Sequence, residues 1–309
     1  MLNAIIVTLP FFALIGIGYL AGRREFVVES GIKGLHTFVF YFALPCLIFR
    51  ALATRPISDI ANPRYMGIYL AAGLLAFTVT AVMGRLFFKS PLGIAALQGQ
   101  AGSVGNVGFL GIPLIIALLG NGAALPVILG WTIDMVVLVP LSIALLEISR
   151  QKSGTDFFAR VLKGVALNPF FLSIVAGAAY AALGLALPEP VDRFTDLLAR
   201  AAGPCALFTL GATMAGKPIS SGLSEALYLT VMKLAFYPLV MFLLMAILFE
   251  IDPLWMKAAV MVAALPVAGN VYIIAQSFDL YVMRASTTIL TSTALGMATF
   301  SILAAFLTG

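Results

Sequence analysis

The sequence reads Gly102-Ser103-Val104-Gly105-Asn106-Val107-Gly108-Phe109-Leu110-Gly111-Ile112-Pro113 in the middle of an apolar segment. This run is a poor continuous helix, because each Gly costs roughly 1 kcal/mol relative to Ala and Pro removes a backbone donor. A later apolar segment is interrupted in the same way by Leu265-Pro266-Val267-Ala268-Gly269-Asn270-Val271-Tyr272. Unwound backbone is tolerated at membrane depth only where it faces protein or a water-filled cavity, so the two breaks predict one shared cavity.

The composition around these breaks is that of a membrane protein. Of the 309 residues, 62% are hydrophobic and 10% are charged, against roughly 25% charged in a soluble domain. A spanning helix takes about 20 residues, so residues 1–309 predict a single membrane unit with roughly ten spans. The apolar runs are continuous and about twice as long as a barrel strand, which favours helices. The ten predicted helices cover about 3–21, 34–53, 66–88, 92–119, 124–148, 161–186, 194–216, 224–249, 254–277 and 283–307.

The basic residues indicate an orientation. The 18 Lys and Arg are scattered singly between apolar runs, which argues against a nucleic-acid partner despite a net charge of +5. Eleven lie in the loops after the odd-numbered helices and six in the opposite loops. Since cytoplasmic loops retain more Lys and Arg, both termini are predicted to face outward from the cell inner (plasma) membrane. The first run, Leu2 to Ala21, is expected to be a retained helix, because it lacks the positive region that opens a cleaved signal.

Residues for metal binding or enzymatic chemistry are scarce. Cys46 and Cys205 lie inside apolar runs and His36 is the single histidine, so we predict no metal site and no disulfide framework. No nucleophile elbow, zinc helix, P-loop or dinucleotide-binding motif occurs in the sequence. We therefore predict no catalytic residue, no cofactor and no enzyme.

Three matches in order suggest an internal repeat. Pro45 to Phe49 reads like Pro204 to Phe208 at an offset of 159, and Asn106 matches Asn270 at an offset of 164. Between them, Pro91-Leu92 matches Pro253-Leu254 at an offset of 162. With five helices in each half, the second copy must enter the membrane from the opposite face. The prediction is two inverted repeats, residues 1–150 and 160–309, joined by the polar connection Ser149 to Arg160.

The paired breaks carry the predicted binding chemistry. Half-helix N-termini that enter the cavity present free N–H groups and a positive dipole end, which favour a carboxylate or a similar anion. Two asparagines add amides that both donate and accept. The alternative is that Gly and Pro here only permit close packing or a kink. The predicted substrate-binding residues are Asn106, Asn270, Gly105, Gly108, Gly269, Ser103 and Tyr272, while Gly111, Pro113 and Pro266 shape the broken helices.

Two charged residues lie inside predicted helices. An intramembrane carboxylate such as Asp134 is costly, so its default interpretation is a proton or cation site, which leaves H⁺ or Na⁺ coupling open. The alternative is a protonated Asp that hydrogen-bonds a neighbouring helix. Lys233 has three interpretations: it pairs with Asp134, it attracts an anion, or it snorkels to the surface, the commonest outcome for a long side chain.

These features predict a secondary active transmembrane transporter of a small organic anion. A passive organic-anion channel or uniporter is the alternative, although channels usually show a selectivity filter or a charged ring within an oligomer. A receptor-like membrane protein would bind the ligand without flux. Saturable counterflow distinguishes the carrier from the channel.

Four stretches resemble one known family. They are Pro10 to Leu20, Tyr41 to Pro45, Asn106 to Leu114 and Pro266 to Asn270. Together they resemble the auxin efflux carrier family, which includes plant PIN auxin exporters and bacterial carriers described as malonate or malate transporters. The resemblance covers essentially the whole chain in the same order. Its most specific part is the Asn-x-Gly-Phe-x-Gly-Ile-Pro element that starts at Asn106.

The resemblance implies an all-α integral membrane fold of ten transmembrane helices in two inverted five-helix repeats, similar to bile-acid/sodium symporters and sodium/proton carriers. Broken helices four and nine would cross near the midplane, where the substrate carboxylate would meet Asn106 and Asn270. A scaffold (about 3–53 and 161–216) would support an elevator-like transport domain (about 66–148 and 224–307), and the scaffold would form a homodimer. The implied substrates are malonate, malate or an auxin-like acid. Plant carriers have an acidic residue in helix three, but Tyr65 to Leu86 has none, which leaves Asp134 as the candidate substitute.

Overall fold

The computed structural model describes residues 2–56, 62–150, 163, 166–215, 222–249 and 251–308, with only the backbone described for residues 2–8. Within these ranges the chain is all helical, and one isolated antiparallel bridge is the only extended pairing. The predicted all-helical fold is therefore confirmed. Most of the predicted central connection, with Lys152 and Arg160, lies outside the described residues, as does Lys217.

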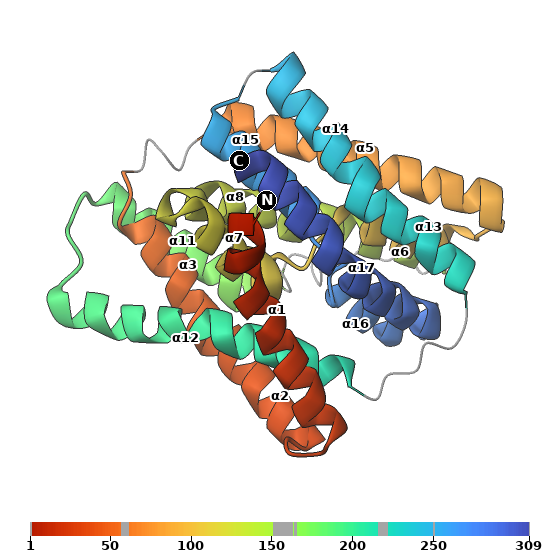
Figure 1. Ribbon diagram of the computed structural model, residues 1–309. Coiled ribbons are helices and arrows are strands. Elements are labelled where there is room, and N and C mark those ends of the chain that lie inside the picture. The colour runs from red at the N-terminus through yellow and green to blue at the C-terminus, as the bar shows by residue number, and fades with distance from the viewer. Residues whose placement is uncertain are drawn as a thin grey trace.

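The first group of helices combines segments from the start of the chain with two helices from its middle. It comprises α1 (Leu2–Arg23), α2 (Glu29–Phe38), η1 (Val39–Ala43), α3 (Leu44–Ala53), α11 (Pro169–Ala182) and α12 (Glu189–Met214). In Figure 1 these helices lie together on one side of the molecule, with α1 along α12 and α3 along α11. Both pairs pack backbone to backbone through glycines. A Cβ on Gly18 would collide with the Phe208 carbonyl, and a Cβ on Gly177 would lie 2.9 Å from the Phe49 carbonyl.

The second group contains both broken segments, and most of its helices lie on the other side of the molecule (Figure 1). Its first part comprises α5 (Pro63–Phe88), α6 (Leu92–Ser103), η2 (Val107–Gly111), α7 (Ile112–Leu119), η3 (Asn121–Ala123), α8 (Ala124–Ile133), η4 (Asp134–Leu138) and α9 (Val139–Ser149). Its second part comprises α13 (Leu223–Val231), η5 (Met232–Phe236), α14 (Tyr237–Phe242), η6 (Leu243–Leu248), α15 (Pro253–Ala263), α16 (Asn270–Ser277) and α17 (Val282–Thr308). Within it, α5 packs on α6, α13 on α17 and α14 on α15.

Prolines explain why several of these helices widen locally. The π-helical turns η1, η2, η4 and η5 are each followed by an α-helix with proline at its second position, namely Pro45, Pro113, Pro140 and Pro238. A proline lacks the N–H of the regular ladder and its ring clashes with the carbonyl four residues earlier, so the preceding turn opens. Asp134 and Lys233 both lie in such turns.

The described helices suit a lipid surrounding. Six segments are long and apolar enough to cross a membrane: Glu29–Ala53, Pro63–Phe88, Asn121–Ser149, Glu189–Met214, Leu223–Leu248 and Val282–Thr308. Four shorter apolar helices cover Leu9–Arg23, Val107–Leu119, Pro169–Ala182 and Pro253–Ala263. Large apolar side chains are exposed on these helices, among them Leu86 at 69% and Phe306 at 75%. A surface of this kind is unfavourable in water and is covered by lipid tails in a bilayer.

Candidate functional site

The two predicted breaks meet and pair with each other. Gly105 and Val267 form the isolated antiparallel bridge. The Asn106 N–H donates to the Pro266 carbonyl at 2.9 Å, and the Ala268 N–H donates to the Val104 carbonyl at 3.2 Å. Each unwound segment thereby supplies hydrogen-bond partners that the other would otherwise lack at membrane depth. We call this contact the crossover.

Four helix ends converge on the crossover. α6 ends at Ser103 and α15 ends at Ala263, while η2 begins at Val107 and α16 begins at Asn270. Neither of these two starts has a side-chain cap among the described residues, where Asn106 and Gly269 hold the capping positions. Free N–H groups at a helix start favour an anion. This is the arrangement that the sequence predicts for a carboxylate site.

A chain of polar side chains connects the two broken helices. Asn106 is 7% exposed and Asn270 is half-buried. The Gln100 Nε2 donates to Asn270 Oδ1 at 3.3 Å, and the Ser142 Oγ donates to Gln100 Oε1 at 2.7 Å. Ser103 is fully buried, and its hydroxyl donates to the Gly99 carbonyl of the same helix at 2.9 Å. Ser142 was not predicted from the sequence. Its one distinguishing feature there is a hydroxyl two residues after Pro140 in an apolar run.

The predicted glycines and prolines differ in their surroundings. A Cβ on Gly108 would lie 2.9 Å from the Trp131 ring, and a Cβ on Gly111 would collide with Leu265. Pro113 packs against Gly203 of α12, and Pro266 packs against Gly296 of α17. Gly269, by contrast, has open space where a side chain would be, and Tyr272 is half-buried on the same short helix. Gly108 and Gly111 thus permit close packing, whereas Gly269 lies on the open side of the crossover.

The intramembrane charges Asp134 and Lys233 are both fully buried. The Lys233 ammonium donates to the Ala263 carbonyl at the end of α15 and lies 4.9 Å from the centre of the Tyr237 ring. A Cβ on Gly105 would lie 3.2 Å from the same nitrogen. The commonest interpretation of this lysine, snorkelling to the surface, is therefore wrong. The turn η5 aims the side chain inward at the second break.

A second buried carboxylate lies away from the crossover. Glu225 is 2% exposed and accepts hydrogen bonds from Gln98, from the Tyr281 hydroxyl at 2.5 Å and from Arg284 at 3.0 Å. It holds α6, α13 and α17 together. Its place in the first turn of a helix resembles a surface position, so the sequence gives no signal of its burial.

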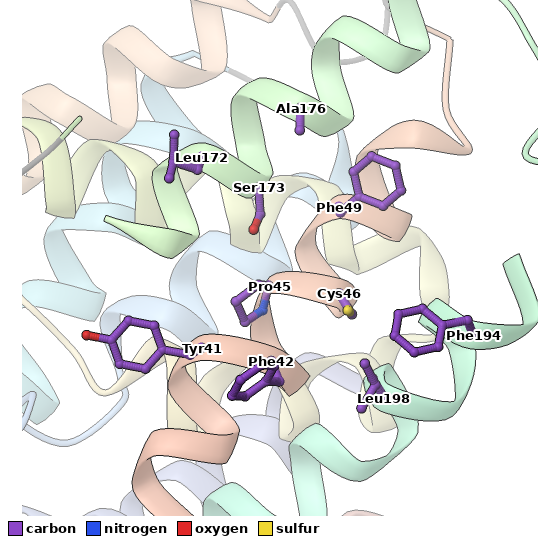
Figure 2. Close-up of a pocket in the computed structure, with 10 residues that line it drawn as sticks. All are labelled: Tyr41, Phe42, Pro45, Cys46, Phe49, Leu172, Ser173, Ala176, Phe194 and Leu198. Carbon is purple, nitrogen blue, oxygen red and sulfur yellow. The ribbon is translucent and has the colours of Figure 1, made fainter. Parts of the chain in front are cut away.

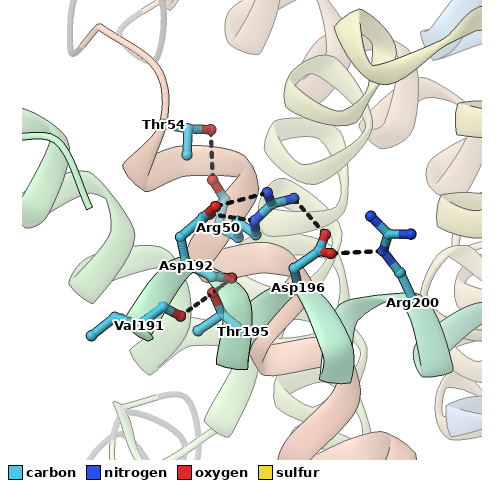
Figure 3. A network of polar contacts seen from close by, with 7 residues as sticks. All are labelled: Arg50, Thr54, Val191, Asp192, Thr195, Asp196 and Arg200. Carbon is cyan, nitrogen blue, oxygen red and sulfur yellow. Dashed lines mark hydrogen bonds and ion pairs between the residues drawn. The ribbon is translucent and has the colours of Figure 1, made fainter. Parts of the chain in front are cut away.

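Two other features belong to the first helix group. A groove of about 360 Å³ lies between η1, α3, α11 and α12. Figure 2 shows that mostly apolar side chains line it, such as Phe42 and Phe194. Figure 3 shows Arg50 bound to Asp192 at 2.7 Å and to Asp196 at 2.9 Å, which joins α3 to α12. Partly exposed ion pairs of this kind contribute little to stability, about 1 kcal/mol or less each. Neither feature includes a crossover residue.

An all-helical chain with an apolar exterior, buried charges and two broken helices that meet inside is a multi-pass membrane protein of the transporter class. The sequence matches the protein family described as "Membrane transport protein" over residues 4–304. The chain belongs to this family, which confirms the resemblance to auxin efflux carriers. The family description indicates a transporter and not an enzyme.

Curated relatives agree with this assignment. A putative malonate transporter of Rhizobium meliloti is 34% identical over 294 residues, which cover 94% of this chain and 92% of that protein. The uncharacterized transporter YfdV of Escherichia coli is 26% identical and covers 93% of this chain and 92% of that protein. The lysosomal cholesterol signaling protein of the mouse is 28% identical over 225 residues, which cover 68% of this chain but 26% of that protein.

Proposed function

We propose that this protein is a secondary active transporter of small carboxylates and works by elevator-type alternating access. The observation that carries the proposal is the crossover, where two uncapped helix starts and two asparagines lie beside a buried ammonium. Free N–H groups and a positive charge favour a carboxylate over a neutral or cationic ligand. The 34% identity to a putative malonate transporter makes malonate the first substrate to test, with malate and auxin-like acids next.

The substrate-binding set is the one that the sequence predicts. Asn106 and Asn270 contact the carboxylate through their amides, with the backbone of Gly105, Gly108 and Gly269 beside them. Ser103 and Tyr272 complete the predicted set, and Gly111, Pro113 and Pro266 keep the helices broken. Gln100 is a positioning residue, because it holds the Asn270 amide at 3.3 Å.

Inverted repeats of residues 1–150 and 160–309 are part of the proposal. Their support is a pair of equivalent contacts: Gly18 meets the carbonyl of Phe208, and Gly177 meets the carbonyl of Phe49. Gly18 and Gly177 differ by 159 positions, as do Phe49 and Phe208. The first helix of each half therefore packs against the second helix of the other half. This is what an inverted pair with a shared centre requires.

The two helix groups correspond to the fixed and moving domains of an elevator-type transporter. We propose that the first group (about 3–53 and 161–216) is the fixed scaffold and that the second group (about 66–148 and 224–307) moves with the substrate. The most extensive helix packing, α1 on α12, α3 on α11 and α5 on α6, lies within the groups and supports this division (Figure 1). The proposal includes a homodimer in the inner membrane, with both termini outside.

Counterflow in proteoliposomes tests the function. Vesicles preloaded with unlabelled malonate should accumulate labelled malonate transiently above equilibrium, because a carrier exchanges substrate and a channel does not. Asn106→Leu should lower this counterflow by about tenfold to a hundredfold, since it removes an amide hydrogen bond to a charged group. The control is Asn121→Leu, the same change at an exposed position in η3. Equal counterflow in the two variants would remove Asn106 from the site, and flux without counterflow would identify a channel.

A further inference from the structure

The Lys233 ammonium lies against the crossover. It donates to the Ala263 carbonyl, lies close to the backbone of Gly105, and attracts the Asp134 carboxylate. An ammonium has three N–H donors, and the Ala263 carbonyl is its one hydrogen-bond acceptor within the described ranges. Lys233 therefore keeps donors for a ligand that arrives at the crossover.

Asp134 and Tyr237 are incompletely bonded. The Tyr69 hydroxyl donates to Asp134 Oδ2 at 3.4 Å, but Asp134 Oδ1 and the Tyr237 hydroxyl have no hydrogen-bond partner in the described part of the chain. No ion pair within 4.0 Å joins Asp134 to Lys233 in that part either. Buried polar atoms are normally hydrogen-bonded, so the unpartnered Oδ1 of Asp134 indicates a missing proton or ligand. The free acceptor Oδ1 is where a proton would bind.

The charges of this cluster determine what binding must change. Asp134 and Lys233 together carry no net charge when both are ionised. The other titratable groups that interact with Asp134 are neutral phenols: Tyr65 and Tyr69 on α5, and Tyr237 on α14. One carboxylate group that enters beside Lys233 adds one negative charge to this cluster, and an uncompensated charge at membrane depth is costly. Protonation of Asp134 restores neutrality.

We propose that a carboxylate bound at the crossover takes Lys233 as its counter-ion and that Asp134 then takes up one proton. This inference rests on the proposed function, and it makes the transporter a proton symporter in which Lys233 changes partner. The proton comes from the buffer acid in the solvent, which becomes its conjugate base, and it forms an O–H bond at Asp134 Oδ1. The substrate stays ionised, and no other covalent bond forms or breaks. We assign the Tyr237 hydroxyl, which is buried in the same cluster, as the acceptor of the new O–H.

Calorimetry of malonate binding tests the proton count without any transport assay. The binding heat of the purified full chain is measured in two buffers that differ in ionisation enthalpy, at a pH where malonate is fully ionised. The difference between the two heats gives the number of protons taken up per malonate. We expect about one for the native protein, about zero for Asp134→Asn with malonate still bound, and about one for Tyr237→Phe with weaker binding.

The matched control is Glu225→Gln, which neutralises the other buried carboxylate, where Tyr281 and Arg284 are the partners. It should leave the count at about one. A count of zero in the native protein, with malonate bound, would overturn the inference and leave the proposed function intact. A count of one in Asp134→Asn would also overturn it, because the proton would then bind elsewhere. Absence of malonate binding to the native protein would instead overturn the proposed function and, with it, this inference.

Discussion

The two breaks of the crossover satisfy their backbones by different means. At the first break the Val104 N–H donates to the Gln100 carbonyl at 2.8 Å and the Val107 N–H to the Gly105 carbonyl at 2.8 Å, so backbone of the same segment accepts both, and the Asn106 N–H uses the Pro266 carbonyl. At the second break the Val267 N–H donates to the Ser292 hydroxyl at 3.1 Å, and Lys233 covers the end of α15. The first break depends on glycine, whereas the second depends on side chains from other helices.

This difference gives the two breaks different chemistry. A lysine at a helix C-terminus offsets the negative end of the helix dipole, so the end of α15 carries a compensating charge. The corresponding end of α6 carries the neutral Gln100 and Ser103. Substitutions on η5 and α17 should therefore disturb the second break strongly, whereas the first break should respond mainly to added volume at its glycines.

The largest effect is expected for Lys233→Met. The substitution removes the hydrogen bond to the buried Ala263 carbonyl and the positive charge that offsets the buried Asp134, and each buried polar group left unsatisfied costs about 1–3 kcal/mol. The thermal unfolding of the purified protein in detergent should show a large fall in melting temperature. The double variant Lys233→Met with Asp134→Asn should recover much of it, because no charge remains unpaired.

Lys33→Met is the control for this prediction. Lys33 has a side chain that is 75% exposed and pairs with the exposed Glu29, so the change should lie within about 0.5 kcal/mol. If the double variant melts no higher than Lys233→Met alone, the two buried charges do not compensate each other, and the contrast between the breaks loses its electrostatic part.

Much of the architecture was predictable from the sequence, because apolar length and helix breakers are local properties. Both breaks, the all-helical fold and the membrane character came from runs of residues that need no partner to be recognised. Errors at helix starts have a physical cause. The predicted starts at 34 and 194 fall five residues inside the observed starts at Glu29 and Glu189, because charged first turns look like loops.

The polar interior was less predictable, because it depends on which helices meet. The sequence singled out Asp134 by its depth in an apolar run, but nothing in the run around Lys233 says that it points to Ala263 rather than to the surface. Glu225 and Ser142 became visible only when α13 and α9 were placed against α6. The predicted roles of Asn106 and Asn270 stay predictions until substrate binding is measured.

A middle-sized effect is expected for Ser292→Ala. The change leaves the buried Val267 N–H without its acceptor, which costs about 1–3 kcal/mol. Thr293→Val is the matched control. The neighbouring Thr293 hydroxyl donates to the Ile289 carbonyl of its own helix at 2.7 Å and not to the second break. Denaturant or thermal unfolding of both variants gives the comparison. Equal stability would mean that water or another group replaces Ser292 at the second break.

The smallest effects are expected where a methyl group is added at each break, because the two breaks differ in the space around their glycines. A Cβ on Gly105 would lie 3.1 Å from both the Leu265 Cβ and the Val262 carbonyl, so Gly105→Ala should cost about 1 kcal/mol through overpacking. Gly269→Ala meets open space at a φ of −62°, where alanine is unstrained, so its effect should stay within about 0.5 kcal/mol. The stability of both variants is measured by their melting temperatures.

Malonate counterflow is the second measurement on these two variants. Because Gly269 lies on the open side of the proposed site, its variant can weaken counterflow at unchanged stability. The reverse pattern, a destabilised Gly269→Ala beside a neutral Gly105→Ala, would contradict the contrast between a tightly packed first break and an open second one.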